Sequence, residues 1–105
     1  MFELIKTEVF SEWLEGLRDR RAIIRILARI ERMSSGNLGD CMPVGEGVSE
    51  ARIHYGAGYR LYFIQHGKTF LVLLCGGDKS TQAGDIAHAK RIATELKAQL
   101  KEDLS

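Results

Sequence analysis

The sequence contains one proline, Pro43, and two cysteines, Cys41 and Cys75, among its 105 residues. The two thiols form no CxxC pair and have no histidine partners at metal-ligand spacing, so a disulfide framework or a metal site is not expected. Long hydrophobic runs are also missing, because the longest, Phe70 to Cys75, is too short to span a bilayer. The first ten residues lack the regions of a signal peptide. We therefore expect a cytoplasmic protein with two free, non-catalytic thiols and no membrane association.

An excess of one charge is likewise absent. Fifteen basic and 14 acidic residues leave a formal net charge of +1, so bulk charge does not indicate a nucleic-acid-binding protein. Any phosphate-binding surface must therefore come from clustering of basic residues. The length and a hydrophobic fraction of 45% predict a single domain, residues 1–105, with one modest core.

The N-terminal third predicts a short strand followed by two helices. The strand covers Phe2 to Lys6, and Thr7 and Asp19 are placed to cap the helices. Apolar residues at helical spacing form one buried stripe in each helix. The stripes are Val9, Phe10, Trp13, Leu14 and Leu17 in the first helix, and Ile23, Ile26, Leu27, Ile30 and Met33 in the second. Gly36 should end the second helix, and the very short connection favours an antiparallel hairpin.

Arginines recur about one turn apart on the second helix, at Arg21, Arg25, Arg29 and Arg32. They predict a basic stripe on the outer face that would bind RNA or an acidic segment of a partner. We take Arg21, Arg25 and Arg29 as the candidate RNA-binding residues. An ordinary solvated helix face explains the same pattern, because neighbouring glutamates can balance the charge.

The middle of the chain predicts three antiparallel strands after a loop. The loop is the glycine-rich stretch Asn37 to Gly47, and the strands are Val48 to Tyr55, Tyr59 to Gln65 and Thr69 to Cys75. The last strand is apolar on both faces, which is typical of a central strand covered on both sides. Two glycines then close the strand region.

The residues from Thr81 onward predict a third helix. Its buried stripe is Ile86, Ala89, Ala93, Leu96 and Leu100. The predicted fold class is α+β: an N-terminal strand and a helical hairpin packed on one face of a small antiparallel sheet, followed by a C-terminal helix.

Polar side chains alternate with apolar ones along the first two strands of the meander. Because residues two apart share a face of a strand, we expect one open sheet face with Glu50, Arg52, His54, Arg60 and Tyr62. Guanidinium groups match the oxygens of a phosphate, and tyrosine can stack on a base. Cross-strand salt bridges on a solvated face would produce the same pattern.

The segment Gly76 to Gln82 is a second candidate anion site, because it combines glycines, Lys79 and the start of a helix. It does not have the spacing of a Walker P-loop. A plain connection between a strand and a helix would look the same.

Four strings of the sequence resemble a known family: EARIHYG at 50–56, GYRLYF at 58–63, LLCGGDKSTQ at 73–82 and DIAHAKRIA at 85–93. The chain resembles the phage-derived HigB-like addiction-module killer proteins of the RelE/ParE superfamily over nearly its whole length. The resemblance implies a RelE-like fold and the toxin of a type II toxin–antitoxin system. It implies an endoribonuclease, an mRNA interferase that cuts mRNA on translating ribosomes and causes translation inhibition. It also implies a HigA-like helix-turn-helix antitoxin as partner, operator DNA contacted only through that antitoxin, and no cofactor.

The resemblance also carries over three basic positions. Arg60 matches the strand arginine of the GYRxYF motif, Arg52 matches the basic position of the preceding strand, and Lys79 matches the lysine of GGDKSTQ. Many RelE and YoeB relatives have a tyrosine or a histidine–tyrosine pair near the C-terminus. Here the tail after Gln82 has only His88 and no tyrosine, so their acid–base scheme does not transfer one to one.

The residues are consistent with metal-independent RNA cleavage. A ribose 2′-hydroxyl would attack the adjacent phosphate, with Glu50 or His54 as the base and His54 or Tyr62 as the acid. The three basic residues would stabilise the charge that develops on the phosphoryl oxygens. Arg60 is expected to point away from the core, so its removal should damage toxicity and leave stability nearly unchanged.

Two other functions fit the same resemblance. ParE-like relatives share the fold, bind DNA gyrase and are not nucleases, and a fold alone does not fix a function. A degenerate module that only binds its antitoxin and co-represses the operon is the third alternative.

Overall fold

The computed structural model describes residues 1–103, and the side chains of residues 1–99. Its elements, in chain order, are β1 (Glu3–Lys6), α1 (Glu8–Glu15), α2 (Arg20–Ser34), β2 (Cys41–Gly45), β3 (Val48–Ile53), β4 (Tyr59–His66), β5 (Phe70–Gly77), the 3-10 turn η1 (Lys79–Thr81) and α3 (Gln82–Asp103). The strands form one five-stranded sheet in the order β1-β5-β4-β3-β2. β1 runs parallel to β5, and the other neighbouring strands are antiparallel. No helix in the described part of the chain is long and apolar enough to cross a membrane.

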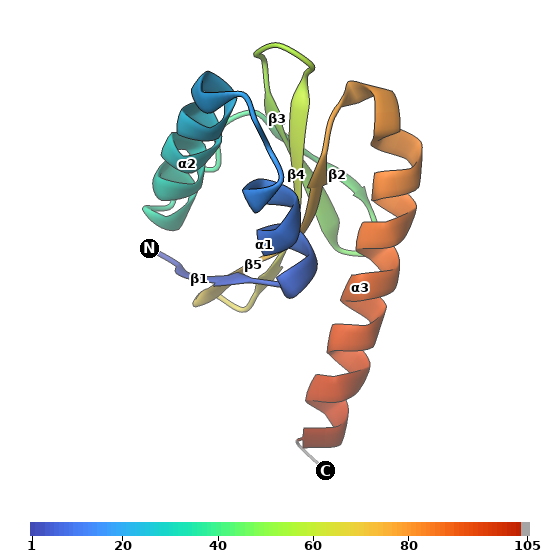
Figure 1. Cartoon of the computed structure of the whole chain (residues 1–105). Helices are drawn as coiled ribbons and strands as arrows, with labels where there is room; N and C mark the ends of the chain where they lie inside the picture. Colours follow the sequence, from blue (N-terminus) through green and yellow to red (C-terminus); the bar gives the residue numbers. More distant parts are fainter. Residues whose placement is uncertain (104–105) are drawn as a thin grey trace.

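The sheet lies between two helical layers (Figure 1). α1 and α2 pack on one face, as predicted for the helical hairpin, while α3 packs on the other. Both helix starts are capped as expected: the Thr7 hydroxyl accepts from the amide of Phe10, and the Asp19 carboxylate accepts from two amides of α2. Gly36, with φ of 101°, follows the end of α2, as its freedom in the left-handed region predicts.

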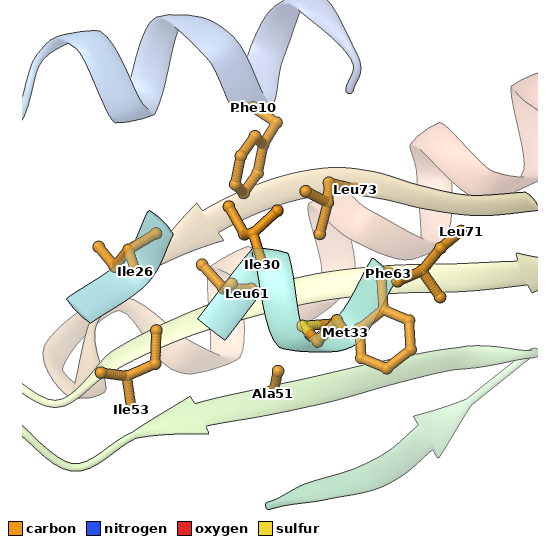
Figure 2. Close-up of a cluster of buried hydrophobic side chains, with 10 residues drawn as sticks. All are labelled: Phe10, Ile26, Ile30, Met33, Ala51, Ile53, Leu61, Phe63, Leu71 and Leu73. Atoms are coloured by element: carbon orange, nitrogen blue, oxygen red, sulfur yellow. The ribbon is translucent and has the colours of Figure 1, made fainter. Parts of the chain in front are cut away.

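The first core lies between the helical hairpin and the sheet (Figure 2). It contains Phe10, Ile26, Ile30, Met33, Ala51, Ile53, Leu61, Phe63, Leu71 and Leu73. The helical stripes are confirmed in their centre but not at their margins. Val9 on α1 and Leu27 on α2 are exposed, whereas Ala22 and Arg29 on α2 are buried. The buried side of α2 is therefore rotated by about one residue position from the apolar pattern.

The second core lies between α3 and the opposite face of the sheet. It contains Val48, Tyr62, Ile64, Val72, Leu74, Cys75, Ala89 and Ala93. The buried stripe predicted for α3 is confirmed at Ala89 and Ala93, with Ile86 and Leu96 half-buried beside them. The predicted member Leu100 lies outside the described side chains. β5 contributes to both cores, which confirms that it is a central strand covered on both faces.

The predicted loop Asn37 to Gly47 is wrong in part, because β2 lies within it and pairs with β3. β2 is an edge strand, where Pro43 is tolerated because only one side of the strand needs backbone donors. β5 also extends two residues further than expected. Its last residues are glycines because neither position has room for a side chain: a Cβ on Gly76 would lie 2.3 Å from the Trp13 ring, and one on Gly77 would clash with Asp85.

Candidate functional site

The centre of the candidate site is the carboxylate of Glu50, a fully buried residue of β3. Oε1 of Glu50 accepts from Nε of Arg52 at 2.9 Å and from Nη1 of Arg60 at 3.0 Å. Oε2 accepts from the hydroxyl of Tyr62 at 3.0 Å and from Nε2 of Gln82 at 2.9 Å. The register explains the cluster, since Glu50 lies opposite Tyr62 and Arg52 lies opposite Arg60 on β4. The sheet face that the sequence predicted thus does bring these four side chains together.

This network fixes the protonation of its members. Burial alone would raise the pKa of Glu50, but the hydrogen bonds from Arg52, Gln82 and Tyr62 and the charge of Arg60 lower it below its usual value. Burial and the hydrogen bond to Glu50 raise the pKa of Tyr62 far above its ordinary range. Glu50 therefore stays ionised and Tyr62 stays protonated, and the Glu50 carboxylate orients the two arginines.

The predicted open face is wrong for Glu50 and Tyr62, because α3 and Gln82 cover them. It is also wrong for Arg60, whose side chain is only 12% exposed and whose Nε is buried without a hydrogen-bond partner among the described residues. Removing Arg60 would leave Glu50 one donor short, so we expect its loss to lower stability, in contrast to the prediction from the sequence. Arg52 is more accessible, with 34% of its side chain exposed.

A shallow pocket of about 450 Å³, here called the cleft pocket, opens beside this network. It is lined by Arg52, His54, Tyr55, Gly56, Ala57, Gly58, Arg60 and Lys79. Three cations from β3, β4 and η1 thus face one space, and Glu50 fixes two of them in place. Gly58, with φ of 75°, allows Lys79 to approach, because a Cβ there would lie 3.2 Å from the Cβ of Lys79. Guanidinium and ammonium groups around one pocket are suited to bind a phosphate.

His54 lies just beyond the end of β3, on the rim of the cleft pocket, and its side chain is 74% exposed. Its Nε2 is 2.6 Å from Oδ2 of Asp40, which precedes β2. The hydrogen bond to His54 lowers the pKa of Asp40, so this carboxylate is ionised and can orient the ring. Sequence reasoning missed Asp40, because nothing in its local pattern places it beside His54.

The arginines of α2 do not form one exposed stripe. Arg29 is 7% exposed, and its guanidinium donates to the carbonyl oxygens of Leu38, Asp40 and Arg52. The prediction of Arg29 on the outer face is therefore wrong. Its donors connect α2 to the segment before β2 and to β3.

Arg21 and Arg25 are exposed, as expected. The guanidinium carbon of Arg25 lies 4.7 Å from the ring centre of Tyr55, which brings α2 against the wall of the cleft pocket. Cys41 and Cys75 are free thiols, as predicted. Sequence reasoning also missed Gln82, although it ends the GGDKSTQ string that contains Lys79.

The fold matches a chain in the crystal structure of the toxin–antitoxin complex RelBE2 from Mycobacterium tuberculosis, with a TM-score of 0.51 and 23% sequence identity. The match covers 74% of this chain and 98% of that chain, and it confirms the predicted α+β, RelE-like fold. No family model matches the sequence.

A relative with a clearer sequence match is an uncharacterized protein of Haemophilus influenzae. The two are 48% identical over 93 residues, which cover 88% of this chain and 94% of the Haemophilus protein. This chain and the Haemophilus protein belong to one family.

Proposed function

We propose that the chain is the toxin of a type II toxin–antitoxin pair and that it cleaves mRNA in the cleft pocket. The observation that carries the proposal is the convergence of Arg52, Arg60 and Lys79 on one pocket, with Glu50 orienting the two arginines. A RelE-like fold, shared with a protein crystallised in a toxin–antitoxin complex, supports it. The HigB-like strings of the sequence support the more specific class of mRNA interferase.

In this mechanism the scissile phosphate lies among the three cations. The ribose 2′-oxygen bonds to phosphorus, the bond from phosphorus to the 5′-oxygen breaks, and a cyclic phosphate remains on the upstream fragment. His54 is the base, because Asp40 accepts a hydrogen bond from Nε2 and leaves Nδ1 to take the hydroxyl proton. Lys79 supplies a proton to the leaving oxygen. Arg52 and Arg60 stabilise the charge on the phosphoryl oxygens.

Glu50 and Tyr62, which the sequence offered as base and acid, act here as positioning residues. Both are fully buried, and the hydroxyl proton of Tyr62 is used in its bond to Glu50. Placement of the arginines before the substrate arrives lowers the cost of reorganisation in the transition state.

We further propose a HigA-like helix-turn-helix antitoxin as the partner, through which the complex contacts operator DNA, and the translating ribosome as the place of action. The adjacent reading frame provides the test of the partner. Its product should form a stable complex with this chain and relieve toxicity on co-expression. Failure of both would remove the antitoxin proposal.

The test of the cleavage proposal is Lys79→Met, because Lys79 is exposed and lies outside the Glu50 network. The matched control is Lys68→Met, an exposed lysine in the turn between β4 and β5, which is not among the residues of the cleft pocket. Loss of a general acid typically costs about 100-fold or more in rate. We expect Lys79→Met to lose translation arrest and mRNA cleavage on induction, and Lys68→Met to retain both.

Labelled amino acids and labelled thymidine distinguish the classes of target. Early loss of protein synthesis together with new mRNA ends is the expected result. An early block of DNA synthesis with intact mRNA would contradict cleavage and indicate a gyrase-directed toxin. Absence of any growth defect in the wild type would indicate a protein that only binds its antitoxin.

A further inference from the structure

A second basic pocket lies between α2 and the sheet, next to the cleft pocket. It has a volume of about 320 Å³. Its polar lining consists of Arg25, Arg29, Arg32, Arg52, His54 and Asp40. We call it the α2 pocket.

The charge of the α2 pocket is strongly positive. Four guanidinium groups face one carboxylate, Asp40, and that carboxylate is already bonded to His54. Arg29 adds its positive charge to the pocket, while its N–H groups donate to backbone carbonyl oxygens. Arg25 and Arg32 are exposed, so their guanidinium groups are available to an incoming anion.

The two pockets share a common ridge. Arg52 and His54 line both of them, so the two pockets adjoin at these side chains. Arg25, which lines the α2 pocket, lies over the ring of Tyr55, which lines the cleft pocket. A ligand that occupies both pockets therefore crosses Arg52 and His54, and the positive charge of each pocket favours an anionic group there.

We propose that the α2 pocket is a second phosphate subsite, which binds the phosphate next to the scissile one in a single RNA strand. This inference rests on the proposed function of the cleft pocket. A polynucleotide presents one anion per nucleotide along a continuous backbone, which matches two basic pockets joined by a shared basic ridge. Arg25 and Arg32 contact the neighbouring phosphate, and Arg52 lies between the two phosphates. The subsite sets the position of the strand over the cleft pocket without reading its sequence.

The test uses oligonucleotides in which the 2′-hydroxyls are methylated, so that binding is measured without cleavage. A dinucleotide with one phosphate and a trinucleotide with two are titrated into the isotope-labelled full chain at low salt and followed by NMR. The variant is Arg32→Gln. The control is Arg20→Gln, which removes an exposed arginine from the same helix at a position outside the α2 pocket.

For the wild type we expect the trinucleotide to bind roughly three- to tenfold more tightly than the dinucleotide, as for an added charge pair at a partly exposed site. Arg32→Gln should lose this difference and still bind the dinucleotide normally. The slope of log affinity against log salt for the trinucleotide should fall by about 0.7, the value for one phosphate contact of a single strand. Arg20→Gln should behave as the wild type.

The alternative outcomes separate the subsite from the proposed function. If Arg32→Gln binds the trinucleotide as tightly as the wild type, the subsite is overturned while cleavage in the cleft pocket stands. If neither oligonucleotide perturbs either pocket, both proposals fail. If Arg32→Gln weakens binding of an acidic antitoxin peptide and leaves the trinucleotide unaffected, the α2 pocket belongs to a protein partner and the inference is overturned.

Discussion

Replacement of Glu50 by glutamine tests whether the buried carboxylate organises the site. The substitution keeps the size of the side chain and removes its charge. An amide oxygen can still accept from Arg52 and Arg60, but the amide nitrogen then faces two donors, Tyr62 and Gln82. Two guanidinium groups also lose the negative charge that neutralises them.

The magnitude follows from the complete burial of Glu50. Removing one partner of a buried ion pair costs about 3–5 kcal/mol, because the remaining charge stays desolvated. We expect Glu50→Gln near the lower end, about 3 kcal/mol, since the amide retains some of the hydrogen bonds. The free energy of unfolding of a domain of this size is typically about 5–15 kcal/mol. The variant should therefore fold, but it should unfold at a markedly lower urea concentration. Glu12→Gln, at an exposed position of α1, is the control and should change stability by less than about 0.5 kcal/mol.

The pH dependence of stability is an independent test of whether Glu50 is ionised in the folded state. The pKa of Glu50 is lowered in the folded state from its ordinary value of 4.5. Its stabilising contribution is therefore fully present above that ordinary value and is lost as the pH falls through the folded-state pKa. The wild type should lose stability more steeply than Glu50→Gln over that acid range, and the difference between them should shrink.

Urea unfolding followed by circular dichroism at pH 7, and then in steps to pH 3, measures both effects. A Glu50→Gln variant within about 1 kcal/mol of the wild type at pH 7 would refute the reasoning on burial. Parallel pH profiles for the two proteins would refute the reasoning on ionisation, even if the neutral-pH difference were as large as expected.

Two further predictions concern packing and thiol chemistry. Gly76→Ala should destabilise the fold by about 1–3 kcal/mol in thermal or urea unfolding, because its Cβ would overlap the Trp13 ring. Gly84→Ala, in open space on α3, should instead stabilise by about 0.5–1 kcal/mol, and equal effects would contradict the argument. Burial raises the pKa of Cys75 to about 12, so at pH 8 iodoacetamide should label the half-buried Cys41 first, as mass spectrometry of digests would show. Faster labelling of Cys75 in the folded protein would contradict the burial of its thiol between β5 and α3.

Local chemistry in the sequence was sufficient to predict most elements of the fold. Thr7 and Asp19 cap helices because their side chains bond amides within three residues, and Gly36 ends α2 because its φ is positive. The alternation along β3 and β4 placed Glu50 and Arg60 on one face, which the register confirms. These features depend on neighbours in the chain, so they are visible in a single sequence.

Only the tertiary structure decided which faces are covered and which segments meet. β2 forms inside a glycine-rich stretch because β3 offers it an edge, and α3 lies on the face that the sequence left open. Arg29 is buried because three carbonyl oxygens of distant segments satisfy its donors, which helical periodicity cannot show. Gln82 reaches Glu50 across 32 positions of the chain. The physical reason is the same in each case: burial and partner depend on residues that become neighbours only when the chain has folded.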